Sequence, residues 1–333
     1  MISKKFRVAV KRLLWVFIPA VLVMVVGVAI LEGYVTYRMT RPPHTQLYGS
    51  PKDFQEILQK PMWFDEKWRN PDGTSSVAWF LSHGKPGPAI ILSHGYGTNR
   101  SQLLTLSFEL WKVGYQVLLY DMRGHGESPV NWSGLGTYEK DDLISGINFI
   151  KGLKDDSGQP LVDGSIGLYG IEMGGYVSLL AASQTPMVKA VAVDSVYPDF
   201  GHYVNYRLKS FLGSGNAMSR LADADVTNRL TGLAMHLYLM KRDDDGTASA
   251  ATGSASGRRL LFIVGKDSGD LGQLTRDLYA ATKDQKELAE VEKTRLDRLY
   301  DKESADYDAR VVAFFTSAIP VTNPIPPGTR ASR

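Results

Sequence analysis

The sequence predicts an α/β protein with a mainly parallel, doubly wound sheet, preceded by a transmembrane helix and interrupted by one lid insertion. Short apolar runs rich in β-branched residues alternate with longer segments of helical period, which is typical of parallel strands covered on both faces. Of the 333 residues, 44% are hydrophobic and 22% are charged, so the chain can bury a large core. This composition excludes collagen, coiled coils and wholesale disorder.

The basic excess of the chain lies in its first residues. The formal net charge is +3. Residues 1–41 hold seven Lys and Arg against one acidic residue, Glu32, which leaves residues 42–333 with 31 basic and 34 acidic side chains, a net of −3. The body of the protein therefore lacks the basic excess that nucleic-acid binding needs, and we expect no nucleic-acid partner.

An uncharged apolar run follows the basic residues. It reaches from Leu13 to Leu31 and extends to Val35 if Glu32 lies at the membrane interface. A hydrocarbon core about 30 Å thick needs ~20 such residues in a helix. A signal peptide has a shorter apolar stretch followed by small residues at a cleavage site, which this sequence does not offer. We therefore expect residues 13–35 to be an uncleaved signal anchor that binds the membrane.

The flanking charges predict the topology. Five Lys and Arg precede the span and two follow it, so residues 1–12 should form a cytoplasmic basic tail of a single-pass protein in the cell membrane. The main domain should then be extracytoplasmic, and periplasmic in a Gram-negative cell. The absence of Cys agrees with an oxidising compartment, and it excludes disulfides, Cys-zinc sites, iron–sulfur clusters and a Cys nucleophile.

The rest of the chain divides into a stalk, a folded domain and a tail. Residues 36–59 read as a stalk with a short helix at 54–58, residues 60–318 as the domain, and residues 319–333, rich in Pro, as a disordered tail. A helix is expected at 138–153, where apolar residues recur at i, i+4 and i+7. Six strands are expected at residues 79–81, 89–93, 116–120, 166–169, 190–193 and 260–264.

The alternation of strands and helices stops between residues 196 and 257. This stretch contains two candidate helices, at 203–211 and 226–239, and a low-complexity run at 246–257. We interpret residues 196–257 as a lid insertion in which the low-complexity run forms a flexible, exposed loop.

Three glycine-rich motifs follow predicted strands in order. They are Ser93-His94-Gly95-Tyr96-Gly97, then Asp121-Met122-Arg123-Gly124-His125-Gly126-Glu127-Ser128, and then Gly170-Ile171-Glu172-Met173-Gly174-Gly175. Each motif alone is weak evidence for a family, because Gly-rich turns follow strands in many α/β proteins. Together, at these separations, they resemble the α/β-hydrolase family, particularly its bacterial esterase and serine-peptidase-like members. The resemblance covers residues 60–317 and implies the α/β-hydrolase fold.

The resemblance also implies a reaction site at the third motif. Members of the family carry a nucleophile at the centre of Gly-x-Ser-x-Gly, on a strained turn between a strand and a helix. Here the glycine frame is intact, but Glu172 occupies the nucleophile position. The oxyanion hole would come from the N–H of Met173 and from the loop at Gly95 and Tyr96.

The base that the family uses is missing. Its His lies in the loop after the last strand, before the C-terminal helix, and takes the proton of the nucleophile. The matching residues 296–303 contain no His, and no His follows His236 anywhere in the chain. The acid that would orient this base is expected at Asp267, although Ser268 and Asp270 also lie near the family's position. Any of these residues can instead be a turn residue or a helix cap.

Several readings of these residues stay open. Glu172 could itself be a nucleophile, as an Asp is in haloalkane dehalogenases and epoxide hydrolases, but its intermediate would still need a base. Glu172 could form an acid and base pair with Asp267 or Asp270, or the lid could supply His202 or His236. His94 and His125 are interpreted as residues that shape their loops, and no spacing supports a metal site. No cofactor is expected.

The favoured interpretation is a catalytically degenerate hydrolase, a pseudoenzyme. The carboxylate of Glu172 lies where the next helix begins and where the oxyanion donors converge, so it could accept their N–H groups in place of a substrate oxyanion. The protein would then act by binding a small-molecule, lipid or protein ligand at its pocket. The alternative is an active ester or amide hydrolase with an unusual site centred on Glu172.

Overall fold

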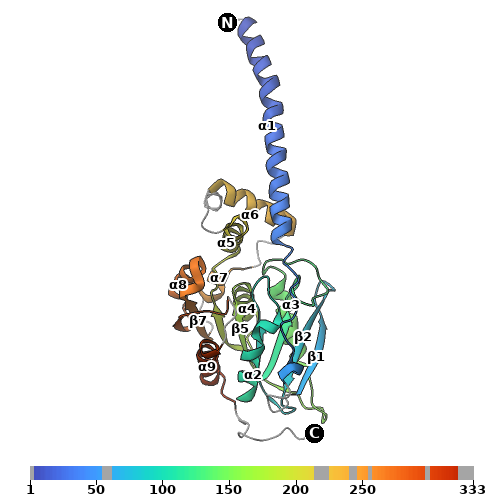
Figure 1. Ribbon diagram of the computed structural model, residues 1–333, viewed down its shortest axis with the longest axis vertical. Helices are drawn as coiled ribbons and strands as arrows, with labels where there is room; N and C mark the ends of the chain where they lie inside the picture. The colour runs from blue at the N-terminus through green and yellow to red at the C-terminus, as the bar shows by residue number, and fades with distance from the viewer. Residues whose placement is uncertain are drawn as a thin grey trace. The chain divides into compact units, whose positions relative to one another are not determined.

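A computed structural model describes residues 4–54, 62–213, 225–239, 246–253, 257–296 and 301–321 (Figure 1). The chain divides into two compact units. The smaller unit comprises residues 1–39 and 207–241, and the larger one comprises residues 40–206 and 242–333. The predicted tail beyond residue 321 and residues 55–58 of the predicted stalk helix lie outside the described residues.

The larger unit is built on a mixed sheet of eight strands among the described residues, in the order β1-β2-β4-β3-β5-β6-β7-β8. β1 and β2 pair antiparallel with each other, β2 pairs antiparallel with β4, and all other neighbours are parallel. The strands are β1 (Met62–Arg69), β2 (Ser75–Ser82), β3 (Gly87–Ser93), β4 (Gln116–Asp121), β5 (Val162–Ile171), β6 (Val188–Asp194), β7 (Arg259–Gly265) and β8 (Gln285–Val291).

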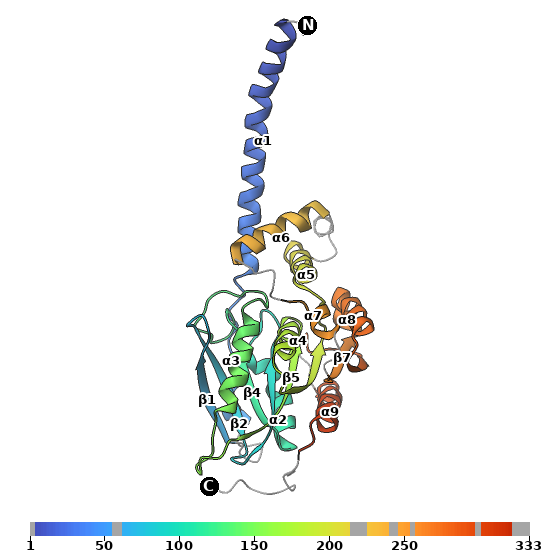
Figure 2. The same cartoon turned by 180° about the vertical axis from the view of Figure 1, so that it is seen from behind.

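Helices cover both faces of this sheet. α2 and α9 contact each other on one face, while α3 and α4 contact each other on the opposite face (Figures 1 and 2). α7 contacts both α4 and α8. The helices of this unit are α2 (Leu104–Lys112), α3 (Glu139–Lys151), α4 (Met173–Gln184), α7 (Ala248–Gly253), α8 (Gly269–Ala281) and α9 (Asp301–Ala318), together with the first half of α5 (Phe200–Leu212).

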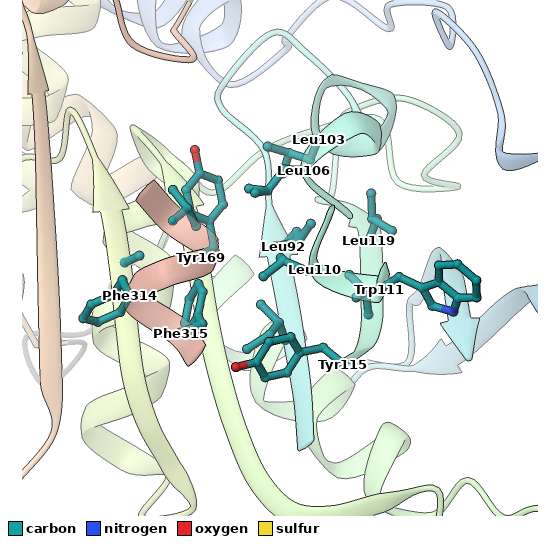
Figure 3. Close-up of a cluster of buried hydrophobic side chains, with 14 of the residues drawn as sticks. Leu92, Leu103, Leu106, Leu110, Trp111, Tyr115, Leu119, Tyr169, Phe314 and Phe315 are labelled. Atoms are coloured by element: carbon teal, nitrogen blue, oxygen red, sulfur yellow. The ribbon is translucent and has the colours of Figure 1, made fainter. Parts of the chain in front are cut away.

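A continuous apolar core fills the space between the sheet and the α2–α9 face (Figure 3). Alternate residues of one strand, such as Ile90 and Leu92, point to the same face, and in this cluster they meet Leu110 of α2 and Phe315 of α9. Each of these side chains is at most 1% exposed, and burial of such a side chain stabilises the fold by about 1.5–3 kcal/mol. Because β3, β4 and β5 contribute to this core, it holds in place the strands whose ends carry the three glycine-rich motifs.

The six predicted strands are confirmed, and each lies within an observed strand. The two edge strands, β1 and β8, were not predicted. β8 has the sequence QKELAEV, and only Ala289 in it is buried. Its many polar residues leave no run of apolar residues by which a strand could be predicted. β1 is also an edge strand, in which charged residues interrupt the apolar ones.

The insertion contains more ordered structure than its sequence indicated. Both predicted helices are present, as α5 and as α6 (Asp225–Leu239). The expected flexible, exposed loop at 246–257 is wrong over residues 248–253, which form α7. Ala248 and Thr252 are buried there, and the Ser249 N–H donates to the carbonyl of Pro198. Small side chains let this helix approach its neighbours closely, whereas the low complexity of the sequence suggested a loop.

The smaller unit consists of α1 (Lys4–Met39), the second half of α5, and α6. Among the described residues, Trp15–Met39 is the one stretch long and apolar enough to cross a membrane. α1 continues four residues past the predicted end of the span, so the segment that follows it begins at Thr40. A short 3₁₀ turn then lies at Pro51–Phe54.

Candidate functional site

Glu172 lies on a strained turn between β5 and α4. Its backbone angles are φ 50° and ψ −110°, a conformation that residues other than glycine rarely adopt. A side chain at Gly170 would collide with the backbone of Gly174, and a side chain at Gly174 would collide with the carbonyl of Ser93. The two glycines are therefore sterically required, and the elbow geometry exists without a serine.

The carboxylate of Glu172 turns toward the loop after β3. The Tyr96 N–H donates to Glu172 Oε2 at 2.9 Å, and a Cβ on Gly95 would lie 3.2 Å from the same oxygen. The side chain makes no capping hydrogen bond to α4, which begins at the buried residue Met173. Gly95, Tyr96, Met173 and Glu172 are thus brought together, and a donor expected for a substrate oxyanion is used by the protein's own carboxylate.

Asp267 lies on the turn after β7 and holds the loop after β8. Its carboxylate accepts hydrogen bonds from the Thr294 N–H, at 2.9 and 3.0 Å to its two oxygens, and from the Thr294 hydroxyl at 3.0 Å. Thr294 belongs to the loop after β8, the last strand. In the family that this chain resembles, this loop carries the catalytic His. Here the acid binds the backbone of the loop instead of an imidazole.

A second strand-end acid, Asp194, holds the same loop. The Arg295 N–H donates to Asp194 at 2.9 Å, the Tyr307 hydroxyl at 2.6 Å and the Ser195 hydroxyl at 2.8 Å. Burial raises the pKa of Asp194 to about 6, although these hydrogen bonds act to lower it. Asp194 also lies beside the elbow, because its carbonyl accepts from the Glu172 N–H at 2.8 Å.

The roles of Asp194, Thr294 and Arg295 were not predicted from the sequence. Asp194 had a visible signal, since it directly follows the strand predicted at residues 190–193 and precedes Ser195. Thr294 and Arg295 had none, because their partners lie 27 and 101 residues away in the chain.

His94 and His125 shape the loops next to the elbow. His94 donates from Nδ1 to the carbonyl of Gly95 at 2.7 Å and accepts the Met122 N–H on Nε2 at 3.1 Å, which requires a neutral ring. Burial lowers its pKa to about 4. His125 donates from Nδ1 to the carbonyl of Arg123, and burial lowers its pKa to about 3. Its ring packs edge-on to Tyr96, with centroids 5.3 Å apart.

A stack of tyrosine rings stands close to the elbow. Tyr197 lies between Tyr176 and Tyr203, with ring centroids 4.6 and 4.1 Å away. All three rings are at most 2% exposed. Burial raises the pKa of Tyr197 well above its usual value, and the negative charge of Glu172 contributes to that rise.

The two lid histidines differ in their surroundings. His202 is exposed and contacts the carboxylate of Asp199 at 2.9 Å. His236 is exposed on α6, in the smaller unit. Over the described ranges, no group of three or more His, Asp and Glu side chains is arranged to hold a metal ion.

Comparison with known proteins yields one family match and several relatives. The model of the X-Pro dipeptidyl-peptidase (S15) family matches residues 79–236. The uncharacterised protein YfhR of Escherichia coli K12 is 27% identical over 258 residues, covering 74% of this chain and 78% of YfhR. The uncharacterised protein YqkD of Bacillus subtilis is 30% identical over 130 residues, which cover 38% of this chain and 40% of YqkD.

A solved structure gives the same fold. The esterase Pf2001 of Pyrococcus furiosus superposes with a TM-score of 0.60 at 19% identity, covering 84% of this chain and 98% of the esterase. Taken with the strand order and the three strand-end motifs, these matches show that the chain has the α/β-hydrolase fold and that residues 79–236 are similar to the S15 peptidase family.

Proposed function

We propose that this protein is a membrane-anchored, extracytoplasmic α/β-hydrolase-family protein that has lost serine-hydrolase catalysis and binds a ligand or partner beside Glu172. The hydrogen bond from the Tyr96 N–H to Glu172 Oε2, 2.9 Å long, carries this proposal. A substrate oxyanion would have to displace a carboxylate that is already bound and negatively charged. Electrostatic stabilisation of that oxyanion is therefore lost.

The loop after β8 supports the same conclusion. Asp267 holds the backbone and hydroxyl of Thr294, and Asp194 holds the N–H of Arg295. Both strand-end acids are thus used to fix a loop that contains no histidine. A nucleophile at the elbow would have no general base to accept its proton.

Two buried polar atoms near the elbow support ligand binding. In the part of the chain that the structure describes, the Tyr197 hydroxyl and Nε2 of His125 are buried without a hydrogen-bond partner. Such groups are rare in folded proteins, because each costs about 1–3 kcal/mol when it is left unsatisfied. A ligand with its own donor and acceptor groups would satisfy them.

Labelling with a fluorophosphonate probe tests the loss of catalysis. The probe reacts with activated serines, so we expect no labelling of the full-length protein or of its Glu172→Ser variant, since the variant gains a hydroxyl but no base. The Pyrococcus esterase in the same buffer would serve as a positive control if it reacts with the probe. Labelling of the Glu172→Ser variant at residue 172 would show that a base is present and would contradict the proposal.

One observation favours the alternative of an active hydrolase. The strained backbone of the elbow is retained at Glu172, and such strain usually persists where function requires it. Under this alternative Glu172 acts directly on a substrate, and replacing it would abolish turnover.

Membrane anchoring by α1 rests on the uncharged run at residues 13–31 and on the basic residues before it. We expect the full-length protein to stay in the membrane fraction at alkaline pH. External protease added to spheroplasts should digest the main domain. Release at alkaline pH would contradict the anchor, and protection of the domain would contradict the topology.

A further inference from the structure

α6 carries two apolar faces on opposite sides. Residues three or four apart share one face of a helix, and α6 has two such sets. One set is buried and consists of Thr231, Met235 and Leu239. The other set is exposed to solvent, and we call it the α6 stripe: Val226 (68% exposed), Leu230 (38%), Leu233 (55%) and Leu237 (66%).

The helix bearing the stripe is joined to α1 where the apolar span ends. The Thr231 hydroxyl of α6 donates to Glu32 Oε2 of α1 at 2.9 Å. The neighbouring helix α5 also contacts α1, because the rings of Tyr34 and Phe211 meet edge-on with centroids 6.5 Å apart. Glu32 is the first charged residue after the uncharged run that ends at Leu31. Within the smaller unit, α6 therefore lies at the level where α1 would leave the hydrocarbon.

The residues around the stripe suit a membrane–water interface. Arg229 and Asp225 form an exposed ion pair at 2.9 Å on one flank, and the ring of Tyr238 is 43% exposed. Helices that lie in the interface have a narrow apolar face bordered by charged residues, and tyrosine is enriched at that depth. Insertion of the stripe would be favourable because it removes apolar surface from water.

We propose that α6 lies in the membrane–water interface, with the α6 stripe inserted among the acyl chains of the leaflet at the C-terminal end of α1. The inference rests on the proposed membrane anchoring by α1. We name a phospholipid leaflet as the partner because the stripe and the exposed apolar surface of α1 belong to one unit. In this unit, Thr231 on the opposite face of α6 contacts Glu32 at the end of the apolar run. The insertion between β6 and β7 would then be attached to the membrane through α6.

Single-cysteine variants of the full-length protein test this, since the chain has no native cysteine. A fluorophore is attached at Leu233→Cys, and the protein is reconstituted in vesicles of phosphatidylcholine and phosphatidylglycerol. Matched variants are Arg229→Cys on the polar flank of α6, Lys112→Cys at an exposed position near the end of α2, and Val23→Cys within α1. Quenching is measured with a doxyl group on the lipid chain and with iodide in the buffer.

We expect the label at residue 233 to be quenched by the doxyl lipid and to have a several-fold lower iodide quenching constant than the label at residue 112. The label at residue 229 should be quenched less by the lipid than the one at residue 233. Equal iodide quenching at residues 233 and 112 would overturn the inference. Protection of residue 233 from both quenchers would also overturn it, because a protein surface would then cover the stripe. Absence of lipid quenching at residue 23 would show instead that the anchor itself has failed.

Discussion

At the scale of single residues, the elbow keeps the backbone conformation of the family but carries a different side chain. Glu172 retains a φ of 50° and the glycines that permit it, while its carboxylate accepts the Tyr96 N–H. A backbone strained in this way is normally maintained by surrounding structure, here by the buried strand β5 and the helix α4. Exchange of one side chain can therefore change the chemistry of the site without dismantling it.

Glu172→Ala and Glu172→Gln should differ in stability. Both variants keep the backbone strain, but only Gln retains an oxygen that can accept the Tyr96 N–H. We expect Ala to lower the free energy of unfolding by about 1–3 kcal/mol relative to wild type, and Gln by less. Chemical denaturation of the full-length proteins in detergent measures this. Equal losses in the two variants would mean that the hydrogen bond contributes nothing.

His94 should make stability depend on pH. Its folded pKa, about 4, lies below the ordinary value of 6.5, so the unfolded chain binds the additional proton first as the pH falls. The stability that neutral His94 contributes is complete above the ordinary pKa and is lost between the two values, by up to about 3 kcal/mol. The cost of His94→Gln should therefore shrink as the pH is lowered from neutral toward 4. A cost that does not vary with pH would contradict a buried, neutral ring.

The residues that form the elbow could be predicted from the sequence, whereas most of the contacts around it could not. The sequence itself shows that Glu172 lies between Gly170 and Gly174 and that no His follows His236. The link from Asp194 to Arg295 is not visible, because it joins residues 101 positions apart and depends on the register of the sheet.

At the scale of elements, the loop after β8 is fixed from several directions. Besides its backbone contacts to the strand-end acids, it carries Arg295, whose guanidinium pairs with Asp308 of α9, and both side chains are about 4% exposed. Thr294 and Arg295 are therefore tied to β6, to the turn after β7 and to α9 at once, which leaves these two residues little freedom to move.

Arg295→Ala should be strongly destabilising. The variant leaves the carboxylate of Asp308 buried without its partner, and we expect a loss of about 3–5 kcal/mol in the free energy of unfolding. Arg276→Ala is the matched control, because Arg276 forms an exposed ion pair with Glu290 of β8 at 3.0 Å and should cost at most about 1 kcal/mol. If the two variants lost similar free energies of unfolding, burial of the Arg295–Asp308 pair would not contribute to stability.

The elements that sequence reasoning missed share a physical cause. β8 and β1 are edge strands, so solvent covers part of each strand and polar residues replace the apolar pattern. α7 is built from small residues that carry almost no hydrophobic signal, although Ala248 is completely buried. Central strands were predicted correctly because they are buried and therefore apolar along their length. β3, for example, is buried at every residue.

At the scale of the whole molecule, the charge distribution and the fold describe two functions of one chain. The basic excess lies around the apolar span found among the described residues, whereas residues 42–333, which include the sheet and its helices, carry a net charge of −3. Membrane attachment and ligand binding are thus proposed for different units of the chain. For the larger unit, we propose that Glu172 occupies an oxyanion donor and that the site lacks a base to activate a nucleophile.

Turnover of p-nitrophenyl esters tests that claim most directly. The full-length protein, its Glu172→Ala variant and its Glu172→Ser variant are compared at equal concentration in detergent, with the detergent alone as the blank. We expect the three proteins to show the same rate, indistinguishable from the blank, because none has a base to activate a nucleophile. Ester hydrolysis by the wild-type protein that disappears in Glu172→Ala would contradict the account and establish Glu172 as a catalytic residue.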